Sequence, residues 1–144
     1  MSFDLKIIAG DLVINNGLLQ TVVDTEKLIQ DILKICLTTA GTNPLQPWYG
    51  SFISRTLIGN PNYTSVLVQI AKSQLTTALT NLQQLQALQL QSFQRVTADE
   101  QLSAILDISV IQNTANPTLF SIVIQVLSKG LKPVSTKFMV NSLT

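Results

Sequence analysis

Histidine is absent from this 144-residue chain, and cysteine occurs only once. Without histidine, neither a Ser-His-Asp nor a Cys-His catalytic arrangement can form, and the usual zinc sites lack their ligands. The single cysteine, Cys36, cannot form a disulfide within the chain and falls on the apolar side of a predicted helix, as a small core residue would. These absences favour a protein without catalytic, metal or cofactor sites, made in a reducing, intracellular compartment.

Charge is the second shortage. Asp, Glu, Lys and Arg make up 12% of the residues, about half the usual share of roughly 25%. Their place is taken by Gln, Thr, Ser and Asn, which are easier to bury than ions. Such a surface suits a subunit covered by neighbours, although composition alone equally describes an ordinary soluble domain. A net charge of +1 argues against a nucleic-acid partner, because phosphate binding needs a dense basic surface.

Long apolar runs are also missing. No stretch reaches the roughly eighteen apolar residues that a membrane-spanning helix needs. The N-terminus lacks the apolar segment and small-residue cleavage site of a secretory signal. We therefore expect no membrane partner, and the length predicts one domain over residues 1–144.

The first predicted elements are a hairpin and a helix. Asn15-Asn16-Gly17 lies between two apolar runs. Since Asn and Gly tolerate positive φ, the pattern predicts a β-hairpin with strands near Leu12–Ile14 and Leu18–Val22. A residue of the pair Asp24-Thr25 is expected to cap the helix that follows, which should end at Gly41.

The connection after that helix, residues 38–51, reads TTAGTNPLQPWYGS and holds the only tryptophan of the chain. Pro44 and Pro47 restrict its conformations. Trp48 and Tyr49 offer the large amphipathic surface that is enriched at protein interfaces. An equally good interpretation is a hydrophobic plug beneath the loop.

A second, long helix is predicted from about Tyr63 to Ser92, where Gly and Pro are absent. Its apolar seam recurs every three or four residues from Val68 to Leu85. A helix must cover the sheet in a small α+β domain, so a core role is favoured over a coiled-coil dimer seam. The other face is nearly uncharged, through either compositional drift or burial against a partner. It comprises Thr76, Thr77, Thr80, Gln83, Gln84 and Gln86.

The C-terminal third alternates with a period of two, which predicts strands. Leu106, Ile108 and Val110 are expected on one face of the first strand. A second run spans Phe120–Val126 and a third Val134–Val140, and Pro133 marks the third as an edge strand. The predicted fold is α+β: an N-terminal β-hairpin, two helices, the second long, and a C-terminal antiparallel sheet of two to three strands.

Nothing in the sequence marks an active site. The chain has eight carboxylates, but they have simpler interpretations as helix caps or turn residues, such as Asp99-Glu100 before the sheet. The glycines are scattered through turns and form no phosphate-binding loop. We therefore expect a protein that is not an enzyme.

The order of these features resembles a known family. A short hairpin, a helix containing Gln30, the residues TTAG at 38–41, a proline-bearing turn and the pair Tyr49-Gly50 follow one another. This succession is similar to the baseplate wedge family of contractile phage tails, the sheath initiators long called lysozyme-like. Relatives occur in contractile bacteriocins and type VI secretion baseplates. The resemblance covers about residues 11–126, with Arg95-Val96 in the place where the family's sheet opens.

One motif departs from the family. Family members commonly have Glu-Pro-Arg before the sheet, where this chain has Phe93-Gln94-Arg95. Only Arg95 carries over, together with the docking role against larger wedge subunits that the resemblance implies.

The resemblance implies a structural subunit of a tail baseplate, made in the host cytoplasm, that initiates sheath assembly. Its partners would be other wedge subunits, the tail sheath protein, and tail tube or hub proteins. Sheath arms would add as strands to a sheet edge, and the C-terminal run is the expected edge. The predicted contact residues are Trp48, Tyr49, Arg95, Val96, Lys132, Val134, Thr136, Lys137, Phe138 and Val140. The alternatives are a cell-wall glycosidase of the tail, suggested by the family's old label, and a coiled-coil assembly adaptor.

Overall fold

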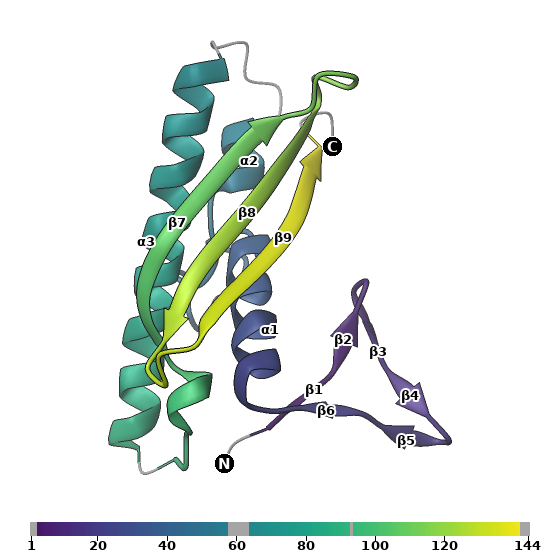
Figure 1. Ribbon diagram of the computed structural model, residues 1–144, viewed down its shortest axis with the longest axis vertical. Coiled ribbons are helices and arrows are strands. Elements are labelled where there is room, and N and C mark those ends of the chain that lie inside the picture. The colour runs from purple at the N-terminus through teal and green to yellow at the C-terminus, as the bar shows by residue number, and fades with distance from the viewer. Residues whose placement is uncertain (1–2, 58–63, 93, 142–144) are drawn as a thin grey trace.

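A layer of helices covers one face of the C-terminal sheet, and a small β arm projects from the N-terminal end of the first helix (Figure 1). This arrangement comes from a computed structural model that describes residues 3–57, 64–92 and 94–141. The fold is α+β, as predicted.

The N-terminal arm consists of three antiparallel pairs of two-residue strands. The pairs are β1 (Asp4–Leu5) with β6 (Thr21–Val22), β2 (Ile7–Ile8) with β3 (Asp11–Leu12), and β4 (Ile14–Asn15) with β5 (Leu18–Leu19). Where they meet, backbone amides donate in a closed ring. Lys6 donates to Gln20 O (2.8 Å), Gln20 to Val13 O (2.9 Å) and Val13 to Lys6 O (3.1 Å).

The predicted hairpin is correct only around its turn. Asn16 and Gly17 both have positive φ between β4 and β5, as a two-residue hairpin turn requires. Leu12, however, pairs with Ile7 and not with the run 18–22. The reason is that residues 4–8 supply competing strands, which the sequence did not mark.

Helix α1 (Asp24–Leu37) differs from its prediction at both ends. Val23 is the N-cap residue, so neither member of the Asp24-Thr25 pair caps the helix. At the other end the helix stops at Thr38, whose backbone is extended, and not at Gly41. Gly41 has positive φ within the following loop.

Two further helices complete the layer, the short α2 (Ile53–Leu57) and the long α3 (Thr64–Gln91). The seam of α3 is core, as favoured from the sequence, because its central side chains are buried: Ala71, Leu75, Ala78 and Leu82. Gln86 was wrongly placed on the polar face, since it too is buried. Because the seam is occupied by the core, it is not available as a coiled-coil surface.

The C-terminal sheet is an antiparallel meander in the order β7 (Leu102–Gln112), β8 (Leu119–Ser128), β9 (Pro133–Asn141). Its helix-facing side chains form the core with α1 and α3. They include Ile108, Val110, Phe120, Ile122, Ile124, Val126, Val134 and Phe138. The prediction that Leu106 shares a face with Ile108 and Val110 was wrong, since Leu106 is exposed and the other two are buried. A register shift between Ile105 and Asp107 turns Leu106 to the exposed side, as an inserted residue does in a β-bulge.

Candidate interaction surface

Strand β9 is a regular sheet edge. Its pairing with β8 runs without a register shift from Pro133 to Asn141. The Ser128 amide donates to Lys132 O (3.0 Å) at the turn, so Ser128 and Lys132 form a hydrogen-bonded pair of the antiparallel ladder. Every second residue of β9 counted from Lys132 therefore directs its N–H and C=O groups toward β8. The residues whose N–H and C=O groups therefore point away from β8 are Ser135, Lys137 and Met139. Pro133 belongs to the same outward-pointing set, so the absence of an N–H group at this proline costs no hydrogen bond to β8.

The opposite edge, β7, is irregular and partly covered. Two register shifts interrupt its pairing with β8. Two α3 glutamines bind its first residues: Gln83 Nε2 donates to Ser103 O (2.9 Å), and Leu102 N donates to Gln86 Oε1 (2.8 Å). Bulges and side-chain covers protect a sheet edge from strand addition. Of the two edges, β9 is the better template.

The side chains of the predicted contact residues of β9 lie on two different faces of the sheet. The side chains of Val134, Thr136 and Phe138 are buried and that of Val140 is half-buried, so they serve the core and offer no surface to a partner. Lys137 is exposed on the open face of the sheet. A partner strand would meet the backbone of β9 and not these inward side chains.

Lys132 is less available than predicted. Its ammonium group bonds Asp99 Oδ2 at 2.7 Å, and this hydrogen bond and charge raise the pKa of Lys132. The ion pair ties the β8–β9 turn to the turn η1 (Ala98–Glu100), which precedes β7. Lys137, the other lysine among the predicted contact residues, forms no ion pair with any described residue.

Arg95 and Val96 lie in the extended segment between α3 and η1. The side chain of Arg95 is exposed and makes no hydrogen bond or ion pair with the described residues. Val96 is half-buried, and the sheet begins only at Leu102, so this pair does not open the sheet directly. Phe93 lies outside the described residues.

The loop at residues 38–51 folds back on the end of α1. Ser51 N donates to Thr38 O (2.8 Å), Ala40 N to Ser51 O (3.1 Å), and Ser51 Oγ to the Cys36 carbonyl (2.6 Å). These bonds fix the loop and place Trp48 and Tyr49 beside each other in an edge-to-face arrangement at 6.2 Å. Tyr49 packs on the core, as the interpretation of a hydrophobic plug requires. Trp48 is 42% exposed, and its role at an interface stays a prediction.

Cys36 is buried, as predicted, and burial raises the pKa of its thiol to about 12. Burial also raises the pKa of the Tyr49 hydroxyl to about 12. Both groups are therefore neutral at physiological pH. Neither provides a reactive anion.

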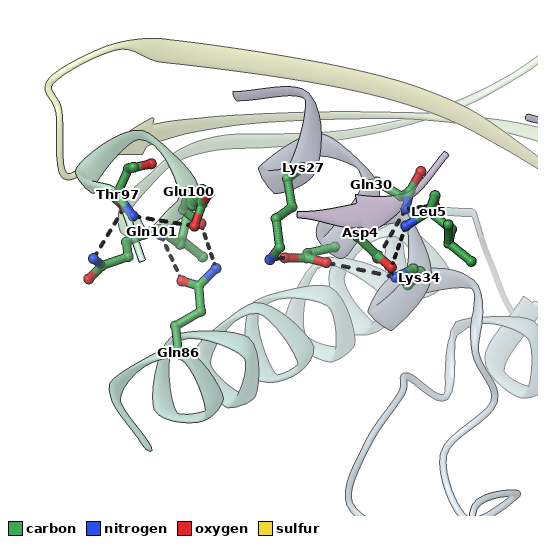
Figure 2. A network of polar contacts seen from close by, with 11 residues as sticks. Asp4, Leu5, Lys27, Gln30, Lys34, Gln86, Thr97, Glu100 and Gln101 are labelled. Atoms are coloured by element: carbon green, nitrogen blue, oxygen red, sulfur yellow. Dashed lines mark hydrogen bonds and ion pairs between the residues drawn. The ribbon is translucent and has the colours of Figure 1, made fainter. Parts of the chain in front are cut away.

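The N-terminal arm is fixed to α1 by a polar latch, which Figure 2 shows around Gln30. Gln30 Oε1 accepts the Ile7 amide (2.9 Å), while its Nε2 donates to Leu5 O (2.8 Å) and to Asp4 Oδ2 (3.1 Å). Lys34 pairs with the same Asp4 carboxylate. Gln30 is itself buried, and its amide satisfies partly buried backbone groups of the arm.

A polar cavity of about 310 Å³ lies beside this latch. Asp4, Lys27, Asp31, Lys34 and Tyr49 contribute to its lining. Asp31 Oδ2 accepts a hydrogen bond from Lys27 Nζ at 2.9 Å, yet burial outweighs this contact and raises the pKa of Asp31. Burial opposes ionisation of Asp4 as well, but the hydrogen bond and charge of Lys34 lower its pKa overall. The pKa values of these two carboxyl groups, which line the same cavity, are thus shifted in opposite directions.

A second polar network, also drawn in Figure 2, joins α3 to the start of the sheet. Gln86 Nε2 donates to Glu100 O at 2.9 Å, and the Thr97 amide donates to Glu100 Oε2 at 3.3 Å. Glu100 is fully buried. The sequence marked Asp99-Glu100 only as a charged turn. The Thr97-to-Glu100 spacing of a capping box was the signal that could have revealed this role.

Comparison of the sequence with known proteins assigns it to no family. No protein-family model matches the sequence, and no curated protein is significantly similar to it. Among the described residues, no three His, Cys, Asp or Glu side chains gather as metal ligands. Within the same ranges, no helix combines the length and apolar character needed to cross a membrane.

Proposed function

We propose that this chain is a structural assembly subunit of the baseplate wedge type, which initiates a contractile sheath by accepting a partner strand on β9. The observation that carries the proposal is the contrast between the two sheet edges. Strand β9 is regular and directs backbone groups outward at alternate residues, whereas β7 is bulged and bound by glutamines from α3. The resemblance of the sequence to sheath initiators supports the same role.

Strand addition makes a specific demand on the backbone. A partner strand would bond the outward N–H and C=O groups of Ser135, Lys137 and Met139, so affinity would come from main-chain hydrogen bonds. Side chains would contribute mainly from the open face of the sheet, where Lys137 could attract an acidic partner. The low charge of the chain would reduce the desolvation cost of being covered by neighbours.

A matched set of substitutions on β9 tests this role. Lys137→Pro removes an outward N–H without touching the bonds to β8, whereas Lys137→Ala keeps the N–H and removes the charge. We expect Lys137→Pro to fold but not to nucleate sheath on baseplates, and Lys137→Ala to nucleate it nearly normally. Thr136→Pro serves as the third variant, because it removes a donor to β8 and should lower thermal stability. Sheath nucleation by folded Lys137→Pro would refute strand addition at this edge.

The glycosidase alternative gains one observation. Asp4 and Asp31 line one cavity and have pKa values displaced in opposite directions, a pattern typical of acid–base pairs. Both carboxylates, however, are engaged by Lys34 and Lys27, which favours a structural role. We expect purified protein to release no sugar from peptidoglycan. Turnover that disappears in Asp31→Asn would overturn this expectation.

A further inference from the structure

A hollow lies on the open face of the sheet, directly beside the β9 edge. Its volume is about 230 Å³. The lining residues come from all three strands: Leu106 from β7, Gln125 from β8, and Pro133, Val134 and Ser135 from β9. The hollow therefore reaches from the edge that would accept a partner strand across the sheet as far as β7.

Two local features leave this space open. Ser135 is a small residue that pairs with Gln125, so the row of side chains across the sheet is low at β9. Leu106 is the residue that the register shift of β7 skips, and it is 54% exposed. The bulge therefore raises an apolar wall at the far end of the hollow, while Pro133 lines the near end.

On the basis of the proposed function, we propose that the hollow receives an aromatic side chain of the strand that adds to β9. The residue directly opposite Ser135 in such a strand points to the same face of the sheet, so its side chain starts at the mouth of the hollow. Leu106 at the far wall lies two strand spacings from β9, about 10 Å. Long and aromatic side chains reach beyond the directly opposite neighbour, and an aromatic ring does so with few rotatable bonds to immobilise.

The chemistry of the lining favours an apolar ring over a charged group. Leu106, Pro133 and Val134 present apolar atoms, and Gln125 and Ser135 are uncharged. A charged side chain would lose hydration here without gaining an opposite charge. A short aliphatic side chain would leave most of the hollow empty.

Lys137 sets a second position on the partner strand. Its side chain is exposed on the same face, two residues after Ser135, and its neighbour on β8 is the uncharged Val123. Opposite charges directly across two strands stabilise the pairing, so we expect Asp or Glu opposite Lys137. The partner segment therefore carries an aromatic residue and an acidic residue that are separated by a single residue.

This spacing argues for a different polypeptide and against a second copy of this chain. None of the eight Asp and Glu residues in the sequence has Phe, Tyr or Trp two positions before or after it. A second copy therefore offers no segment with the required pair of side chains. A subunit of another kind, as the proposed function requires, is the expected source.

Peptide selection tests the proposal with the full chain. A library of random short peptides, displayed on yeast, is selected for binding to the purified protein. Binding at the edge is scored by slower amide exchange at Ser135, Lys137 and Met139, whose N–H groups point outward. We expect the edge-binding peptides to carry Phe, Tyr or Trp two positions from Asp or Glu. Edge-binding peptides without this spacing would overturn the aromatic site and leave the proposed function standing, whereas the absence of any edge-binding peptide would overturn both.

A double-mutant cycle then locates the ring. An enriched peptide and its aromatic-to-alanine counterpart are titrated against wild type and Ser135→Leu, which fills the hollow and keeps the edge N–H groups. We expect the alanine peptide to bind wild type about fivefold more weakly, and Ser135→Leu to weaken only the aromatic peptide. Ser121→Leu, on the open face of β8 outside the hollow, is the control and should leave both affinities unchanged. Equal weakening of the two peptides by folded Ser135→Leu would overturn the proposal.

Discussion

Gly50 passes so close to Thr38 that a β-carbon on Gly50 would lie 2.5 Å from the Thr38 carbonyl oxygen. Gly50 also has a φ of +118°. We expect Gly50→Ala to lower the free energy of unfolding by about 2–4 kcal/mol, because backbone strain and steric overlap add. The control is Gly41→Ala, with φ of +87° but no atom within 4 Å, which should cost only about 1–2 kcal/mol. Urea denaturation measures both, and equal losses would contradict the close approach.

Gln30 should control the docking of the arm more than the folding of the core. Gln30→Leu leaves the Ile7 amide and the Leu5 carbonyl without their partner, which should weaken docking of the arm by about 0.5–1.5 kcal/mol per partly buried hydrogen bond. Hydrogen exchange at Ile7 should therefore become faster, while exchange in β8 stays slow. Gln84→Leu on the exposed face of α3 is the control. Unchanged protection of Ile7 in Gln30→Leu would show that the latch does not hold the arm.

The latch should weaken in acid because of Asp4. Its pKa is lowered in the folded chain, so the stability it contributes is present above its ordinary value of about 4 and is lost as pH falls through the folded value. Asp31, whose pKa is raised, acts oppositely, because protonation relieves its burial. The stability difference between wild type and Asp4→Asn should therefore shrink as pH drops below about 4. A difference that grows in acid would contradict this assignment.

Arg95 should matter for assembly and not for folding. Its side chain is exposed and has no ionic or hydrogen-bond partner among the described residues, so Arg95→Ala should change the free energy of unfolding by no more than about 0.5 kcal/mol. If the role implied by the family resemblance holds, the folded variant will assemble poorly with wedge subunits. Normal assembly would refute the role at this position.

Periodicity predicted the parts of the fold that bury side chains on one face. The alternation at Phe120–Val126 and Val134–Val140 and the seam of α3 all became core. The face of Leu106 was predicted wrongly because a bulge changes which face the next side chains of a strand point to. A bulge depends on how two strands pair, which periodicity does not show. The three-way arm also escaped, since the ring of Lys6, Val13 and Gln20 consists of backbone bonds that side-chain patterns do not encode.

The candidate surface was predictable only in outline. Pro133 marked β9 as an edge, and the structure places that proline on the outward register. The sequence could not show that Gln83 and Gln86 cover the competing edge, because these contacts join α3 to β7 across the fold. The sequence also could not show that Lys132 forms an ion pair with Asp99, because this contact depends on where two turns meet in the fold. Lys132 was therefore predicted as a contact residue for a partner.

The most direct measurement is electron cryomicroscopy of the assembled particle that contains this chain. We expect an extended segment of a sheath subunit to continue the sheet beside β9, with main-chain hydrogen bonds to Ser135, Lys137 and Met139. A particle in which β9 faces solvent, or in which no extended segment pairs with it, would contradict the proposed role in sheath initiation.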